Sequence, residues 1–247
     1  GQALTWMDAK RDGVVFTPRM GKPIELQALW YSGLLELADV LEEKDRGRAR
    51  ELRQSAERCG ASIRSLFWDP AKGLLADVVG MDRGADWSLR PNQIFAASQP
   101  FSPLTPEQRR SVVAVVRDRL LTPMGLKTLD ASDGRYQSKY RGTLFERDRA
   151  YHNGTAWPWL IGAYVRAVLK VGADAGDSRT AASEARGALA TLLEYPRTGA
   201  APGTIPEIFD AESPPGGVQR GEGCMAQAWS VAEVIGAMTA IWAHERG

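Results

Sequence analysis

The chain has 247 residues, 44% hydrophobic and 25% charged, which is an ordinary composition for a folded domain with a sizeable core. Its 31 basic and 30 acidic residues are mixed along the sequence and leave a net charge of +1, which argues against nucleic acid or an anionic membrane surface as the main partner. The two cysteines, Cys59 and Cys224, lie far apart, so a disulfide framework is excluded and a reducing, cytoplasmic compartment is expected.

The first half of the chain predicts helices joined by polar loops. After a loop over residues 8–22, apolar residues recur three and four positions apart over 23–44, the pattern of a helix with one apolar face. A second such pattern covers 46–67 and is ended by an Asp-Pro pair. After another loop over 71–89, Thr105 has the position of a helix cap, with proline and glutamate in the first turn behind it.

The second half continues in the same way. A long loop over 122–153 is followed by predicted helices over 155–171 and 178–195, and the loop 199–223 leads to a last helix over 226–245. The stretch over 155–171 is strongly apolar but carries Arg166 and Lys170, so it does not qualify as a membrane span.

The distribution of apolar residues predicts an all-α fold in layers. The last helix is apolar nearly all round, which is typical of a helix surrounded by protein, whereas the helices over 46–67 and 178–195 have one polar face. Inner helices that alternate with outer ones indicate concentric layers of helical hairpins. No alternation of strand and helix is visible, which disfavours a parallel α/β sheet.

Several kinds of chemistry are disfavoured by the residues available. The two histidines, His152 and His244, have no Cys, Asp or Glu at ligand spacing, so no metal site is predicted. Serine and cysteine nucleophiles lack their motifs, and glycine-rich phosphate loops are absent, so no cofactor is expected. Carboxylates, aromatic residues and amides remain, and this set is typical of sugar binding.

Two acids stand out because their neighbours are apolar. Asp8 follows Trp6 and Met7, and Glu207 follows Pro206 in the segment GTIPEIFDA. Desolvation by such neighbours favours the protonated form of a carboxyl group, which a general acid needs. The alternative for each residue is a solvated loop acid or a helix cap.

Six motifs in this order resemble the amylo-α-1,6-glucosidase module of glycogen debranching enzymes. They are TWMDAK, TPRMGKPIELQALWYSGL, SLRPNQIFAAS, RDRAYHNGTAWPWLIGAY, GTIPEIFDAESP and GCMAQAWSVAEV, and the similarity extends from about residue 4 to residue 240. The resemblance implies an (α/α)6 barrel, of which residues 1–247 would be the C-terminal portion. It also implies hydrolysis of α-1,6-linked glucose at the branch points of glycogen or limit dextrin, with inversion at the anomeric carbon.

The resemblance assigns roles to the two acids. The aspartate of TWMDA, here Asp8, is the general acid of this family, and the glutamate of EIFD, here Glu207, is its general base. The chemistry agrees, because an inverting pair protonates the leaving oxygen from one side and activates a water from the other, about 6.5–9.5 Å apart.

Further residues are candidates for holding the terminal glucose, and each has a structural alternative. Trp6 adjoins Asp8; Gln27 and Trp30 lie one turn apart on the first helix, where Trp30 would serve equally well in the core. The other candidates are Asn92 and Gln93, whose alternative role is helix capping, His152, whose alternative is a backbone hydrogen bond, and Trp157 at the same helix entrance. Arg147 and Asp148 would form a structural pair, and Trp229 would serve packing.

Two other functions remain open. About seven helices are predicted, little more than half of a barrel built from six hairpins, so apolar flanks of inner helices would be exposed unless an N-terminal half covers them. The chain would then be a non-catalytic fragment that binds glucan or a partner chain. A glucosidase of the related glucoamylase or trehalase type, acting on a different linkage, is the other alternative.

Overall fold

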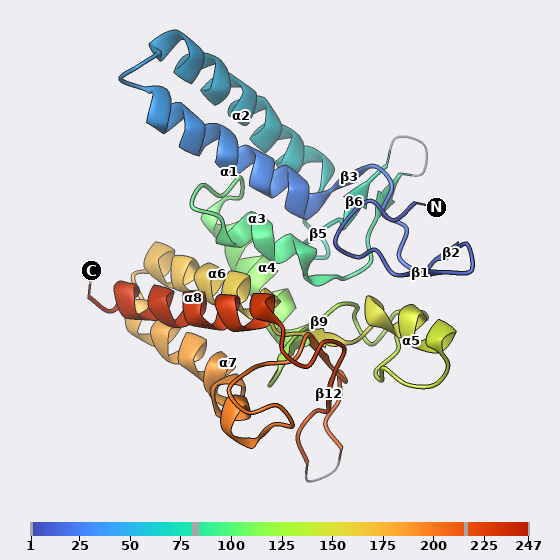
Figure 1. Cartoon of the computed structure of the whole chain (residues 1–247). Helices are drawn as coiled ribbons and strands as arrows, with labels where there is room; N and C mark the ends of the chain where they lie inside the picture. Colours follow the sequence, from blue (N-terminus) through green and yellow to red (C-terminus); the bar gives the residue numbers. More distant parts are fainter. Residues whose placement is uncertain (1, 81–83, 215–216, 247) are drawn as a thin grey trace.

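Helices form the frame of the structure, a computed structural model that describes residues 2–80, 84–214 and 217–246 (Figure 1). The helices are α1 (Ile24–Leu41), α2 (Arg46–Leu66), α3 (Ile94–Ser98), α4 (Pro106–Arg119), α5 (Leu144–Tyr151), α6 (Leu160–Ala175), α7 (Ser178–Thr198) and α8 (Ala228–His244), with a 3-10 turn η1 (Pro91–Gln93) ahead of α3. The six long helices that the sequence predicts are confirmed, with differences at their ends.

Short strands lie in the loops between the helices. They are β1 (Lys10–Arg11), β2 (Val14–Val15), β3 (Lys22–Pro23), β4 (Trp68–Asp69), β5 (Leu74–Leu75), β6 (Val78–Val79), β7 (Ala85–Asp86), β8 (Leu121–Thr122), β9 (Gly125–Lys127), β10 (Ala156–Trp157), β11 (Ile208–Phe209) and β12 (Gly221–Glu222). Every strand pairing in the described part of the chain is antiparallel, and the largest sheet has the order β12-β11-β10-β9-β8. The expected absence of a parallel sheet therefore holds for these pairings.

Four helices form an inner row, on which outer helices pack. Contacts connect α1 to α3, α3 to α6, and α6 to α8, while α2 packs on α1, α4 packs on α3 and α6, and α7 packs on α6 and α8. Figure 1 shows this order from α2 and α1 at the top, through α3, to α6, α8 and α7 below. The layered helical hairpins expected from the sequence are therefore present.

Two helix ends differ from prediction, each at a proline. Residues 156–157 form strand β10 instead of helix, because Pro158 disfavours helical geometry at the preceding Trp157 and α6 begins at Leu160. Conversely, α7 continues through Pro196 to Thr198, since a proline near the end removes only one backbone hydrogen bond.

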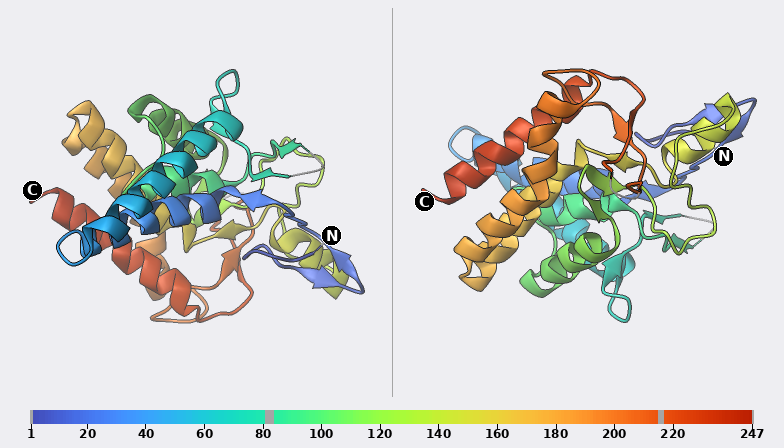
Figure 2. Two further views of the ribbon diagram at one scale, coloured as in Figure 1. Left: turned by 90° about the horizontal axis from the view of Figure 1, so that it is seen from above. Right: turned by 90° about the horizontal axis from the view of Figure 1, so that it is seen from below.

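Helix α5 lies in a region that the sequence predicts as loop. Thr143 and Glu146 form a reciprocal capping box at its start, in which each side chain accepts from the backbone N–H of the other residue. Its eight residues are too few for a reliable apolar periodicity. The helix lies against β1, and Figure 2 shows the β1–β2 hairpin and α5 side by side at the end that carries the N-terminus.

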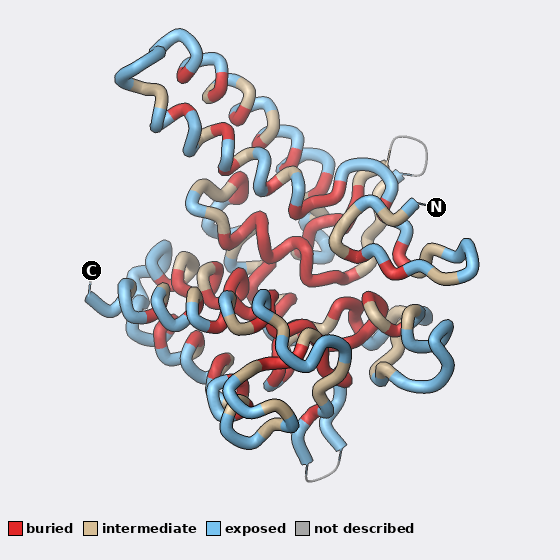
Figure 3. Tube along the Cα trace, in the orientation of Figure 1, coloured by how far each residue is buried: buried red, intermediate tan, exposed pale blue. Residues whose placement is uncertain are grey.

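The core follows the inner row. Figure 3 shows α3 and much of α6 buried, whereas α1 and α2 alternate between buried and exposed residues along their length. The α1–α2 hairpin has a small core of its own, formed by Leu34, Ala38, Ala49, Leu52 and Ala56.

The two ends of the inner row expose apolar side chains. On α1 the exposed residues include Leu29, Trp30, Leu37 and Val40, and on α8 they include Ile235, Met238 and Trp242. Exposed flanks are what the sequence predicts for inner helices of a partial barrel, and α8 is not enclosed in this chain. No helix within residues 2–80, 84–214 and 217–246 is long and apolar enough to cross a membrane.

Candidate active site

Asp8 lies between two buried residues at the start of the β1–β2 hairpin. Met7 is fully buried and Ala9 nearly so, whereas Asp8 itself is exposed. The backbone N–H of Ala9 lies 3.5 Å from Nδ1 of His152, a long contact that brings the hairpin to the end of α5. Because Asp8 is exposed, the burial that the sequence predicts for it is not present in this chain.

An ion pair fixes the hairpin on α5. Nε of Arg11 donates to Oδ2 of Asp148 at 2.5 Å. Arg11 lies three residues after Asp8, and Asp148 lies three residues before Tyr151. The ring of Phe16 packs edge-on against that of Phe145 on the same helix. Asp148 therefore pairs with Arg11 and not, as the sequence suggests, with Arg147.

Trp6 is held by a buried polar network. Its indole N–H donates to Oδ1 of Asn92 at 2.8 Å, and Nδ2 of Asn92 donates to Asp77 at 2.7 Å. Asp77 and Glu25 both accept hydrogen bonds from Arg19, which is 2% exposed. Burial alone would lower the pKa of Arg19, but the charges and hydrogen bonds of Asp77 and Glu25 raise it, so Arg19 stays protonated.

Trp6 is also the centre of an aromatic group. Its ring makes edge contacts with Trp157, Trp159 and Trp229 at centroid distances of 5.2, 5.1 and 6.4 Å, and with His152 at 5.3 Å. Trp229, at the start of α8, packs on Trp159 as expected but also keeps 37% of its surface exposed. The aromatic group thus connects the loop of Asp8 to the first turn of α8.

Glu207 lies directly before β11, and its carboxylate is held by the segment that leads into α8. Oε2 accepts from the backbone N–H of Cys224 at 3.1 Å, and Oε1 accepts from Nε2 of Gln227 at 3.0 Å. The backbone N–H of Glu207 donates to the carbonyl of Cys224 at 2.8 Å. A carboxylate has four lone-pair positions, so these two hydrogen bonds leave others for further donors.

Gly223 makes room for this carboxylate. Its φ of +69° lies in the left-handed region, and a Cβ at this position would collide with Oε2 of Glu207. Glycine is therefore required here both by backbone geometry and by the approach of the acid.

Tyr151, the last residue of α5, belongs to the aromatic surroundings of His152 and Trp157. Its half-buried ring packs against those of Tyr140, His152 and Trp157. Burial raises the pKa of Tyr151, and the next causes are a hydrogen bond to Glu207 and the charges of Glu207, Tyr140 and Asp8. Of these causes the two from Glu207 are larger than the charge of Asp8, which is the smallest.

His152 is buried and neutral. Its ring stacks on Trp157 at 5.2 Å and is 1% exposed, and within the described residues its Nε2 atom has no hydrogen-bond partner. Burial, followed by the charges of Arg90 and Arg19, lowers the pKa of His152 to about 3. In this chain the ring has no solvent-facing surface for a sugar hydroxyl.

This burial predicts a pH dependence of stability. The folded pKa lies below the ordinary 6.5, so the unfolded chain binds a proton first and stability is lost as the pH falls from about 6.5 toward 3. Between pH 6.5 and 5 the free energy of unfolding should fall by about 2 kcal/mol through this group. We expect His152→Gln not to show this loss. Urea unfolding at both pH values measures it, and His244→Gln, at a histidine that is only partly buried, is the control. An unchanged pH dependence in His152→Gln would contradict the burial.

The remaining predicted sugar contacts divide into buried and exposed residues. Asn92, Gln93 and Trp157 are at most 2% exposed, and their polar atoms form hydrogen bonds within the protein. The side chain of Gln93 bonds to the backbone of both Leu75 and Arg90, and the indole N–H of Trp157 donates to the carbonyl of Tyr151. They lie next to the site as supports. Trp30, on α1, is 62% exposed; Gln27, which is partly exposed, lies on the same helix.

Three residues of the site escape the sequence analysis as functional candidates: Tyr151, Gln227 and Trp229. Tyr151 directly precedes His152, and the other two lie in the motif GCMAQAWSVAEV, but only the fold shows that they meet Glu207 and Trp6. No group of three or more potential metal ligands occurs among the residues that the structure describes.

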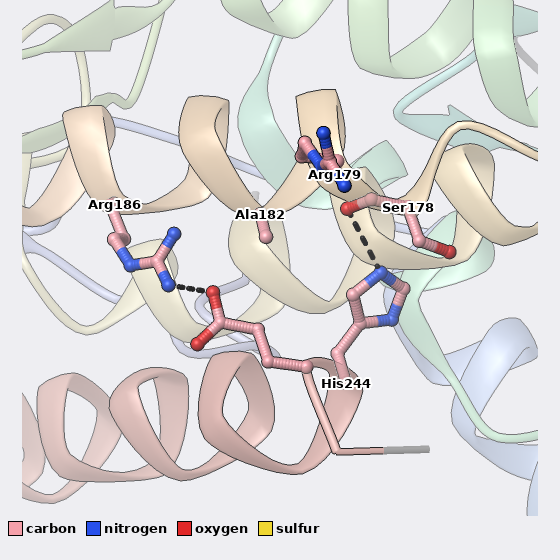
Figure 4. Close-up of a pocket in the computed structure, with 6 residues that line it drawn as sticks. Ser178, Arg179, Ala182, Arg186 and His244 are labelled. Atoms are coloured by element: carbon pink, nitrogen blue, oxygen red, sulfur yellow. Dashed lines mark hydrogen bonds and ion pairs between the residues drawn. The ribbon is translucent and has the colours of Figure 1, made fainter.

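Two well-formed cavities lie elsewhere, between α7 and α8. One, of about 420 Å³, is found where His244 faces the carbonyl of Ser178 (Figure 4). The other, of about 520 Å³, is lined by apolar residues that include Leu193, Met238 and Trp242. Neither contains a residue of the acid pair or the aromatic group, so both cavities lie apart from the candidate site.

Comparisons with known proteins show the family of the chain. The sequence model of the amylo-alpha-1,6-glucosidase family matches residues 1–236. The glycogen debranching enzyme of Saccharomyces cerevisiae is 28% identical over 208 residues, which cover 66% of this chain and 13% of that enzyme.

Solved structures show the fold. The neutral trehalase Nth1 of Saccharomyces cerevisiae has a TM-score of 0.60 at 16% identity and covers 91% of this chain, which corresponds to 38% of the trehalase. The GH63 mannosylglycerate hydrolase of Thermus thermophilus, in complex with glucose, has a TM-score of 0.62 at 13% identity, over 90% of this chain and 47% of that one. The chain is part of an (α/α)6 barrel and spans less than half of these structures.

Proposed function

The chain belongs to the amylo-alpha-1,6-glucosidase family, and from this premise we propose that it is the C-terminal portion, over residues 1–247, of an inverting glycoside hydrolase. Its substrate is the α-1,6-linked glucose at a branch point of glycogen or limit dextrin. The observation that carries the proposal is the position of Glu207, whose carboxylate accepts from Cys224 and Gln227 in the segment that leads to Trp229, the residue that contacts Trp6. Two carboxyl groups on either side of one sugar are the minimum that inverting hydrolysis needs.

Asp8 acts as the general acid in this proposal. It protonates the glycosidic oxygen as the bond to the anomeric carbon breaks. Its exposure in this chain suits a group that must reach the leaving oxygen.

Glu207 acts as the general base. Its two oxygens are oriented by Gln227 and by the backbone of Cys224, and a water on the opposite face of the sugar gives up its proton to a free lone pair. Trp6 and Trp229 would pack against the glucose ring. Asn92, Gln93, His152 and Trp157 support them, and Gln27 and Trp30 on α1 would line the pocket once the barrel is complete.

The barrel is completed by an N-terminal half that covers the flanks of α1 and α8. The exposed Trp30 and Val40 at one end of the row, and Ile235 and Trp242 at the other, are the surfaces for it. The matched structures extend well beyond the part that this chain covers, which supports the same arrangement. We place the protein in the cytoplasm, since both Cys59 and Cys224 are free thiols.

The test is glucose release from a singly branched limit dextrin, by the chain alone and by the chain joined to an N-terminal half of the barrel. We expect release by the joined protein, with α-1,4- and α,α-1,1-linked glucosides cleaved much more slowly. Faster cleavage of either of those two substrates would instead favour a glucoamylase or trehalase type of activity.

A second function is favoured by the same exposed flanks. A chain that binds glucan or its partner half without catalysis would retain oligosaccharide but release no glucose, even in the joined protein. Glucan binding measured beside the release assay separates the two functions.

A further inference from the structure

A cavity of about 400 Å³ lies apart from the acid pair, where four segments distant in the sequence meet. They are the residues around β4 and β5, those between β7 and η1, the end of α4, and the loop after β9. Leu89 lines the cavity, whereas the neighbouring Arg90 is buried and donates to the backbone carbonyl of His152 at 2.7 Å. None of the residues that line the cavity belongs to the acid pair or the aromatic group, and its volume suits a small ligand.

The charges around this cavity are balanced and fixed. Arg119 donates to both oxygens of Asp130 at 2.9 and 2.5 Å, and Arg135 forms an ion pair with Asp133 at 2.7 Å. Hydrogen bonds from Arg135 lower the pKa of Asp133 to about 2, so this carboxylate stays ionised near neutral pH. Since Lys72 and Arg119 offset Asp130 and Asp133 among the lining residues, the cavity has no excess charge for an ion and suits a neutral ligand with many hydroxyl groups.

One wall of the cavity is an aromatic face. Trp87 is half-buried, and the ammonium group of Lys72 lies 4.7 Å from the centre of its ring. The face of an indole is the negative part of its quadrupole, so it attracts an ammonium group and also the C–H groups of a sugar ring. Lys72 is half exposed, and its ion pair with Asp69 lies at the surface, which is a weak restraint. A sugar can therefore displace it at small cost.

The hydroxyls of Ser88 and Ser132 complete the polar rim. Ser88 exchanges hydrogen bonds with Asp86 and Arg135, and Ser132 donates to Asp130 at 2.5 Å. A half-exposed tryptophan face beside fixed donors and acceptors without net charge is the combination that recognises a hexose.

We propose that this cavity is a second α-glucan site, which holds one neutral hexose unit of the polysaccharide against Trp87. The inference rests on the proposed function for the identity of the polysaccharide. Because the cavity is distinct from the site of Asp8 and Glu207, it binds a different part of the branched molecule from the glucose that is removed. Its effect is to keep the polymer on the protein between successive cleavages.

Affinity electrophoresis in gels that contain glycogen tests the proposal, with the full chain in the Asp8→Asn, Glu207→Gln background so that no substrate is consumed. We expect Trp87→Ala to raise the Kd for glycogen by about tenfold, since it removes the stacking face. Ser132→Leu removes a rim hydroxyl and fills part of the cavity, so the Kd should rise at least several-fold. Ser62→Leu is the matched control for Ser132→Leu, because Ser62 is an exposed serine on α2 outside this cavity, and it should leave the Kd unchanged.

Each outcome is decisive. Loss of affinity in both cavity variants, with the control unchanged, supports the site; affinity like that of the parent in Ser132→Leu overturns it, even if Trp87→Ala fails to fold. The proposed function is tested separately by glucose release. If glucose is released but the cavity variants do not change the Kd, only this inference is contradicted. If the cavity variants raise the Kd but no glucose is released, only the hydrolase proposal is contradicted.

Discussion

Glu207→Gln is expected to lower kcat for glucose release by the completed barrel about 10²–10⁴-fold, with a much smaller change in KM. Glutamine keeps the shape of the side chain but cannot accept a proton from the attacking water, and a positioned general base contributes about this factor. The amide can still be held near Gln227 and Cys224, so folding should be preserved.

The matched control for this variant is Glu222→Gln. Glu222 lies on β12, where it pairs with Ile208, the residue after Glu207. Its carboxylate forms an ion pair with Arg220 at 2.8 Å. It should retain most of the activity. A loss of less than about tenfold in Glu207→Gln would remove this residue from the role of base.

Arg19→Met is expected to lower the free energy of unfolding by about 3–5 kcal/mol, because it leaves two buried carboxylates without their partner. Arg19 bonds Asp77 and Glu25 at 2.6–2.7 Å, and Asp77 in turn orients Asn92 and Trp6. The loss should therefore also disturb the environment of Trp6. Urea unfolding gives the stability, and near-UV circular dichroism reports on the tryptophans.

Arg53→Met serves as the control for this prediction. Arg53 makes ion pairs with Asp39 and Glu42 at the surface of the α1–α2 hairpin, where such pairs contribute little. We expect almost no change in its unfolding midpoint. A similar midpoint for Arg19→Met and Arg53→Met would show that the buried network does not stabilise the fold.

The helical frame could be predicted from the sequence because its signals are local. Apolar spacing identifies α1, α2 and α7, and the Thr105 cap followed by Pro106 locates the start of α4. The start of α6 is not predictable in this way, because residues 156–157 form β10, which pairs with β9 and β11. Such long-range pairs leave no periodic pattern in two residues.

The candidate site was only partly predictable. Short motifs single out Asp8 and Glu207 as candidates, but such motifs specify residue types and not the contacts between segments far apart in the chain. The burial of His152 depends on Trp6, Trp157 and Arg90, and the restraint on Glu207 depends on Gln227, all brought together by tertiary packing. Apolar neighbours in sequence likewise did not imply burial, since Asp8 is exposed although Met7 is not.

The anomeric form of the first glucose released tests the central claim most directly. Two carboxyl groups that act from opposite faces of one sugar, one as acid and one through a water, must invert the configuration at the anomeric carbon. Proton NMR of the completed barrel acting on an α-1,6-branched dextrin should therefore detect β-glucose before mutarotation. If α-glucose appears first, Asp8 and Glu207 do not work as this pair.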